Sequence, residues 1–204
     1  LAAGPDLFLQ PDGTAMPFNA GVVGGRSVGT PGTLALIELA HRLHGRLPWA
    51  ELPTAAIDLA EKGFEISPRL AVAIADGAAK LTSFPASRGY FLDADGQPRQ
   101  AGALLRNPEF AASLRRIAAE GSAPLYRGRL GDALVEAVGK SPVSPGLLSR
   151  EDLANYRVAL RDPVCRPYRT ARVCGMGPPS SGGIAVLQIL GLLEHFDMVG
   201  LGPS

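Results

Sequence analysis

The run Gly-Pro-Pro-Ser-Ser-Gly-Gly at residues 177–183 is the most unusual local sequence in the chain and a candidate anion site. Its two prolines fix an extended approach, and Ser180 or Ser181 is suited to cap the apolar helix expected after it. Free amides at such a helix start also attract anions. The residues alone favour a structural cap over a ligand site. Ser180 and Ser181 are therefore candidates for positions beside a site, and no catalytic residue is assigned.

A second candidate is Ser27, because residues 25–29, Gly-Arg-Ser-Val-Gly, match the G-x-S-x-G nucleophile elbow. The elbow places its serine on a strand-to-helix turn, followed by an acid and a histidine, and only His195 keeps that order. The fold also requires parallel strands, where this chain has helical patterns. A glycine turn before a helix is favoured, and we expect no labelling of Ser27 by a fluorophosphonate probe.

Two further patterns resemble ligand sites. Gly139-Lys140-Ser141 resembles the end of a phosphate-binding loop, but Leu134 stands where the loop needs glycine, so no phosphate cradle is expected. His41 and His44 lie one helical turn apart, one turn after Glu38. A metal site needs three or four converging ligands. A solvated helix face is therefore favoured, and no metal or cofactor is expected.

The two cysteines, Cys165 and Cys174, fall on consecutive expected strands nine residues apart. They could pair across a hairpin, but buried free thiols are more common and are favoured here. The pair therefore leaves the cellular compartment open.

Composition bounds the class of protein. Twenty Lys and Arg residues balance 19 Asp and Glu residues, which removes the electrostatic footprint of a nucleic-acid binder. The 46% hydrophobic content can fill a core. The longest apolar stretch, residues 183–193, is too short to span a bilayer. Because residue 1 is Leu, we expect a processed or excised piece of a globular protein.

Hydrophobic periodicity predicts a mainly helical chain with a few short strands, organised as one partial domain over residues 1–204. Its expected parts are a loop with a short strand at Val22-Val23 (1–30), a helical region (31–155), and strands with a buried helix (156–204). The expected helices start at Thr30-Pro31, Pro48, Ser67-Pro68, Asn107-Pro108, Arg129, Ser149 and Gly182. The expected inward positions include Leu36, Leu43, Leu52, Leu59, Val72, Ile74 and Phe110. The expected C-terminal strands are 156–160, 164–168 and 171–176. The last helix, 182–195, is apolar on nearly all sides and should be covered on every side.

Together these segments resemble the γ-glutamyltranspeptidase family, also called γ-glutamyltransferases or glutathione hydrolases. Residues 22–32 are similar to the family's G-x-x-S-V-G-x-P-G. The other matching stretches are 45–52 with 60–64 and 67–70, 105–108 with 125–128, and 178–183 with 188–190 and 196–197. Gly177 stands where a third proline is expected.

The resemblance implies the αββα sandwich of N-terminal-nucleophile hydrolases, formed when a precursor cleaves itself into two subunits. The chain would be the middle of the large subunit. The arginine that binds the substrate α-carboxylate and the threonine nucleophile would lie outside it, so the chain alone should be inactive. The implied partners are the chain's own small subunit and γ-glutamyl molecules such as glutathione, with no nucleic acid and no membrane span.

Several alternatives stay open. One is a same-fold amidase such as a cephalosporin acylase, and another is a non-catalytic scaffold. Relatives suggest a periplasmic or extracellular location. Uncovered apolar surface would also let the isolated chain self-associate.

Overall fold

The computed structural model describes residues 3–198 and 200–202. Its contacts divide the chain into two compact units, Leu1–Val158 and Ala159–Ser204, which are called the helical unit and the hairpin unit below. The expected mainly helical fold with a few short strands is confirmed. In the described ranges, no helix combines the length and apolarity needed to cross a bilayer. Because each unit is described by itself, the expectation of one partial domain stays a prediction.

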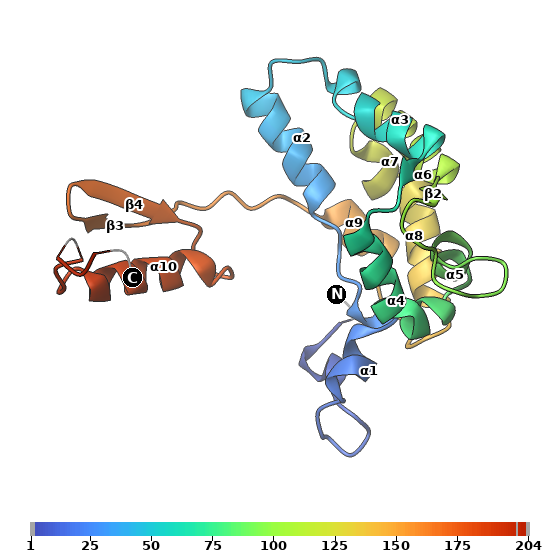
Figure 1. Ribbon diagram of the computed structural model, residues 1–204, viewed down its shortest axis with the longest axis horizontal. Helices are drawn as coiled ribbons and strands as arrows, with labels where there is room; N and C mark the ends of the chain where they lie inside the picture. The colour runs from blue at the N-terminus through green and yellow to red at the C-terminus, as the bar shows by residue number, and fades with distance from the viewer. Residues whose placement is uncertain (1–2, 199, 203–204) are drawn as a thin grey trace. The chain divides into compact units, whose positions relative to one another are not determined.

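The helical unit is a series of short helices joined by turns and one small sheet (Figure 1). Its elements are η1 (Pro5–Phe8), α1 (Phe18–Val22), η2 (Gly25–Ser27), α2 (Thr33–His44), η3 (Trp49–Glu51), α3 (Thr54–Lys62), β1 (Phe64–Glu65), α4 (Pro68–Thr82), α5 (Pro85–Phe91), β2 (Leu104–Leu105), α6 (Pro108–Glu120), α7 (Ala123–Tyr126), α8 (Arg129–Gly139) and α9 (Arg150–Asn155). The hairpin unit contains β3 (Val164–Tyr168), β4 (Ala171–Gly175) and α10 (Gly182–Leu193).

Local capping chemistry explains why three helices begin where the sequence predicts. The Ser67 hydroxyl accepts a hydrogen bond from the Leu70 amide at 3.2 Å before α4. The Asn107 side chain accepts one from the Phe110 amide at 2.9 Å before α6. At α9, Ser149 and Asp152 form a complete capping box. Hydrogen bonds from the Ser149 hydroxyl and amide hold the pKa of the Asp152 carboxyl below its usual range.

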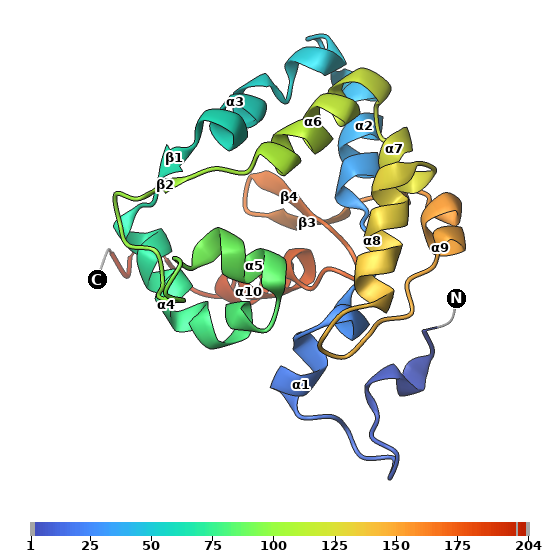
Figure 2. The same cartoon turned by 90° about the vertical axis from the view of Figure 1, so that its right-hand side faces the viewer.

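The core of the helical unit forms around the antiparallel β1–β2 pair, in which Phe64 faces Leu105. Leu105 packs with three other buried side chains, Ile66, Ile74 and Leu92. These residues come from β2, α4 and the segments beside them, so the small sheet joins α4 and α5 to the rest of the unit. Figure 2 shows α3 and α6 side by side, and contacts between the two helices support that arrangement.

A second set of contacts holds α2 against α7. The Tyr126 hydroxyl donates to the Pro31 carbonyl at 2.6 Å and accepts from the Ala35 amide at 3.2 Å. Burial raises the pKa of Tyr126. The Glu38 carboxylate accepts from the Ser122 amide at 2.8 Å and from the Ser122 hydroxyl at 2.7 Å. Polar side chains from α2 and α7 thus satisfy the main-chain groups at each other's starts.

Gly25 packs closely against the turn after α8 and is hydrogen-bonded to it. Its amide lies 3.2 Å from the Val143 carbonyl and 3.1 Å from the Ser141 hydroxyl. A Cβ atom at Gly25 would collide with the Val138 carbonyl oxygen, and one at Gly146 would collide with the Gly25 carbonyl. The two main chains can approach this closely because both positions lack a side chain.

Several expected element boundaries are wrong. Val22-Val23 is not a strand, because Val22 ends α1. Residues 156–160 also form no strand, since nothing pairs with them in the described chain. The Thr30-Pro31 cap is wrong too, because α2 starts at Thr33. The helix expected from Pro48 is interrupted before Thr54 by a turn that contains Pro53.

Burial of apolar helix positions is less complete than expected. Ile74 is buried as expected. Most of the other expected inward positions are half exposed: Leu36, Leu43, Leu52, Leu59, Val72 and Phe110. Within the described residues nothing covers these faces, so the periodicity marks surfaces that this chain alone does not bury.

The hairpin unit is a two-stranded antiparallel hairpin with α10 packed along it. The expected strands near 164–168 and 171–176 are confirmed, with β4 ending at Gly175. Leu187 is the single large apolar side chain buried among this unit's described residues. Ile189 and Leu192 stay 54% and 66% exposed, so the expected cover on every side of α10 is wrong within this chain. A single hairpin covers only one side of a helix.

Candidate functional site

The candidate site is the turn from Gly175 to Gly183 and the first turn of α10, where the sequence places Ser180 and Ser181. The Pro178–Pro179 bond is cis. The Ser180 amide donates to the Gly177 carbonyl at 3.2 Å, which closes a tight turn. Both serines are exposed, so their hydroxyls lie at the surface of this unit.

Glycine packing places this turn against the end of β4. A Cβ atom at Gly175 would lie 2.6 Å from the Gly183 Cα, which is closer than real Cβ contacts come. A Cβ atom at Gly183 would collide with the Met176 carbonyl. The start of α10 therefore rests directly on the β4 main chain, an approach that glycine permits.

The expected side-chain cap at this helix start is wrong. Ser181 is the N-cap residue, but its hydroxyl makes no capping hydrogen bond. Its backbone is already in the helical region (φ −84°, ψ −21°), and its carbonyl accepts from the Ala185 amide at 2.9 Å. The amides at Gly182 and Gly183 have no acceptor among the described residues. The two serine hydroxyls also have no partner within the described residues, so these amides and hydroxyls can donate hydrogen bonds to a carbonyl or carboxylate group.

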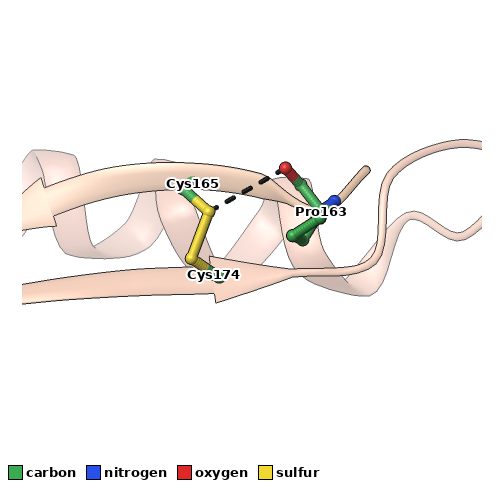
Figure 3. Close-up of a disulfide and its surroundings, with 3 residues drawn as sticks. All are labelled: Pro163, Cys165 and Cys174. Carbon is green, nitrogen blue, oxygen red and sulfur yellow. Dashed lines mark hydrogen bonds between the residues drawn. A yellow bond between two sulfur atoms is a disulfide. The ribbon is translucent and has the colours of Figure 1, made fainter. Parts of the chain in front are cut away.

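The favoured interpretation of the cysteines as buried free thiols is also wrong. Cys165 and Cys174 face each other in the β3–β4 register and are disulfide-bonded, with Cα atoms 4.1 Å apart (Figure 3). Cys174 is exposed and Cys165 is partly buried. The Cys165 sulfur lies 3.8 Å from the Pro163 carbonyl oxygen, a contact without a proton because both sulfurs are bonded. Direct cross-strand pairing brings the two sulfurs together.

Arg166 links the hairpin to α10, a contact that the sequence patterns did not predict. A Cβ atom at Gly191 would lie 2.6 Å from the guanidinium carbon of Arg166. The same guanidinium lies 3.5 Å from the Glu194 carboxylate. Gly191 therefore leaves room for the arginine to cross the helix. A glycine inside an apolar helix was the one signal of a close approach.

The structure does not assemble a nucleophilic site at Ser27. The Ser27 hydroxyl lies 2.7 Å from the Val22 carbonyl and 3.0 Å from the Gly24 carbonyl. The residue ends a 3-10 helix and does not follow a strand. The hydroxyl therefore donates its hydrogen bond to main-chain carbonyl oxygens, as serines in turns commonly do.

The other ligand-like patterns are separated by the fold. His41 Nε2 lies 2.7 Å from the Leu47 carbonyl, whereas Glu38 binds Ser122. In the part of the chain that the structure describes, no three His, Cys, Asp or Glu residues converge as metal ligands. Lys140 pairs with Glu136 at 2.8 Å. Helix α8 ends at Gly139 and so precedes Lys140 and Ser141, whereas a phosphate-binding loop is followed by its helix.

Comparisons with known proteins cover most or all of the chain. The family model described as "Gamma-glutamyltranspeptidase" matches residues 1–204. The "Acylase ACY 1 proenzyme" of Pseudomonas sp. (strain V22) is 42% identical over 181 residues, covering 89% of this chain and 32% of that protein. The "Glutathione hydrolase proenzyme" of Bacillus subtilis (strain 168) is 37% identical over 196 residues, covering 96% of this chain and 32% of that protein.

A solved structure shows the same fold. Helicobacter pylori gamma-glutamyltranspeptidase superposes with a TM-score of 0.93 at 31% identity, covering all of this chain and 57% of the other. The expected membership in the N-terminal-nucleophile hydrolase fold is thereby confirmed. This chain spans about a third of the length of the curated relatives that it matches. From the match over its full length, the chain belongs to the gamma-glutamyltranspeptidase family.

Proposed function

We propose that this chain is part of the large subunit of a self-processing enzyme that transfers or hydrolyses γ-glutamyl groups. The family model's match over residues 1–204 carries the proposal. The "proenzyme" in the names of two relatives supports a cleaved precursor. The partner would be the small subunit made by that cleavage, and the substrates would be γ-glutamyl molecules such as glutathione.

The chemistry would be acyl transfer through a threonine that becomes the small subunit's N-terminus. Its free α-amine would take the proton from its own hydroxyl, which attacks the γ-glutamyl amide. The acyl group then passes to water or to an amine. This threonine lies outside the chain, so the chain's role would be to scaffold the site.

Ser180 and Ser181 are the residues of this chain that we place beside the site. Their exposed hydroxyls support that placement, as do the amides at the start of α10, which have no acceptor in the described part of the chain, because such groups can hold a carbonyl or carboxylate. The glycine contacts with β4 support it as well, since they fix the turn in one position. Their role would be to orient substrate or the neighbouring loop.

An acylase that cleaves other side-chain amides is the second candidate. The observation in its favour is the identity of 42% to "Acylase ACY 1 proenzyme", against 37% to the glutathione hydrolase of Bacillus subtilis. The two candidates share the fold and the proposed nucleophile and differ in the acyl group that they accept.

The deciding experiment uses the complete coding sequence that contains these residues. We expect the purified precursor to convert into two chains, resolved by mass spectrometry, with a threonine at the new N-terminus. We then expect turnover of γ-glutamyl-p-nitroanilide and of glutathione. Processing with turnover of a cephalosporin side-chain amide alone would replace the first candidate with the second. Absence of processing and of both activities would leave the scaffold interpretation.

The 204-residue chain by itself should be inactive, because the proposed nucleophile lies outside it. We also propose that it self-associates through its exposed apolar helix faces, among them Ile189 and Leu192 on α10. Turnover of the anilide by the pure chain would contradict the first expectation. A monomeric mass by light scattering together with a cooperative melt would contradict the second.

A further inference from the structure

The Cys165–Cys174 disulfide sits where the hairpin meets the candidate site. Cys174 is the residue before Gly175, and Gly175 is the glycine on which Gly183 packs. The bond therefore fixes the end of β4 that supports the first turn of α10. Any separation of the strands at this position moves the main-chain surface under the turn that carries Ser180 and Ser181.

Among the residues of the hairpin unit that the structure describes, little else resists such a separation. Each strand is five residues long, and Pro167 in β3 has no amide to donate to the ladder. A two-stranded hairpin is marginally stable without further packing. Among the described residues of the unit, Leu187 alone adds a buried large apolar side chain. The Arg166 guanidinium adds a half-exposed ion pair with Glu194, which contributes little.

The disulfide is also within reach of a reductant in this chain. Cys174 is exposed and Cys165 is partly buried, so the bond lies near the surface of this unit, where a small thiolate can reach it. Exposed disulfides exchange more readily than buried ones. Accessibility and a dependent neighbouring turn are the two features that a redox-operated element needs.

We propose that the Cys165–Cys174 disulfide is a redox latch that holds the Ser180–Ser181 turn in place and releases it on reduction. A dithiol reductant attacks one sulfur, breaks the sulfur–sulfur bond and forms a mixed disulfide, which its second thiol then resolves. Two electrons and two protons pass to the protein as two cysteine thiols, and the reductant leaves as its own disulfide. The free strands then fray at β4, and the start of α10 loses its support.

The test compares amide hydrogen exchange in the complete protein with the latch closed and with it reduced by dithiothreitol without denaturant. Alkylation with iodoacetamide and mass spectrometry counts the thiols. We expect exchange in peptides covering residues 171–187 to speed up about tenfold or more on reduction. Peptides from α6 in the helical unit should be unchanged. Hydrogen exchange is measured without substrate, so this experiment tests the latch independently of the proposed function.

Two variants control for effects other than the bond. Cys165→Ser with Cys174→Ser should exchange rapidly with and without dithiothreitol. Cys165→Val with Cys174→Val keeps strand-forming side chains without the bond and should show the same insensitivity to reductant. The proposal is overturned if both thiols are alkylated and exchange at 171–187 stays within about twofold of the oxidised protein. It is equally overturned if the bond resists reduction in the folded protein.

Discussion

The helical unit and the hairpin unit are stabilised by different kinds of interaction. The helical unit closes a core of its own around Ile66, Ile74, Leu92 and Leu105. The hairpin unit buries one large apolar side chain among its described residues, Leu187, and closes its strands with a covalent bond. Hydrophobic burial grows with size, so a segment of fewer than fifty residues gains little from it and relies on other constraints.

The contrast also separates two kinds of apolar helix. In the helical unit, α4 directs Ile74 into the core and leaves Val72 exposed, as an amphipathic helix does. In the hairpin unit, α10 has apolar residues on nearly all sides, and among the described residues of the unit it packs mainly against the β3–β4 hairpin. A helix that is apolar on nearly all sides is normally covered on all sides, so we expect α10 to contact residues outside this chain. We therefore expect the two units to respond differently to substitutions of similar size.

The largest effect is expected in the core of the helical unit. Leu105→Ala removes a side chain that is 3% exposed and should lower the free energy of unfolding by about 2–5 kcal/mol. Leu104→Ala, one residue away and 46% exposed, is the matched control and should cost less than half as much. Urea denaturation followed by circular dichroism measures both. Equal losses of unfolding free energy would mean that burial in this core does not determine the stability of the helical unit.

The next largest effect is expected where the main chains interlock. Gly25→Ala places a methyl group against the Val138 carbonyl and should cost about 1–3 kcal/mol of unfolding free energy. Gly29→Ala is the control, since a Cβ atom there meets nothing within 4 Å. If both variants melt at the same temperature, the close packing of Gly25 contributes nothing.

A smaller effect is expected at the capping box of α9. Ser149→Ala should cost about 1 kcal/mol. Because the pKa of Asp152 is lowered in the folded chain, the stability from that carboxylate is present above the usual aspartate pKa and is lost as pH falls through the lower folded value. The difference in stability between the native chain and Asp152→Asn should therefore shrink in acid. A difference that is the same at about pH 6 and about pH 2.5 would contradict this assignment.

The smallest effect is expected in the hairpin unit. Ile189 is 54% exposed, so Ile189→Ala should change the unfolding free energy of the 204-residue chain by about 0.5 kcal/mol or less when the chain is diluted until it is monomeric. In the complete protein, where we expect α10 to be covered, the same substitution should cost about 2–5 kcal/mol. A large loss in the isolated chain would show that the two units do not differ in the way described.

Local capping signals in the sequence predicted three helix starts correctly. Ser67-Pro68, Asn107-Pro108 and the Ser149–Asp152 spacing each specify a helix start through contacts within a few residues. Such contacts can be worked out from neighbouring side chains alone. The sequence did not predict the short helix α7, because distant contacts fix its position. Ser122 binds Glu38 of α2, and Tyr126 binds the Pro31 carbonyl just before α2.

The candidate site was predicted only in part. The helix after Gly182 could be predicted from its apolar run. The disulfide could not, because pairing depends on the β3–β4 register, which the sequence left open. The missing serine cap has a similar cause. The Ser181 backbone is already helical, and the nearby approach of Gly183 to Gly175 joins segments whose contact no local pattern specifies.

The interlock of Gly25 also sets an order of events during synthesis. The Gly25 amide binds the Ser141 hydroxyl 116 residues further along the chain. At about 5–20 residues per second, a ribosome needs about 6–23 s to make that partner after Gly25. Until Ser141 has been made, the Gly25 amide lacks the hydroxyl that it binds, although α2 to α6 can already form. The beginning of this chain is therefore among the last parts of the helical unit to settle.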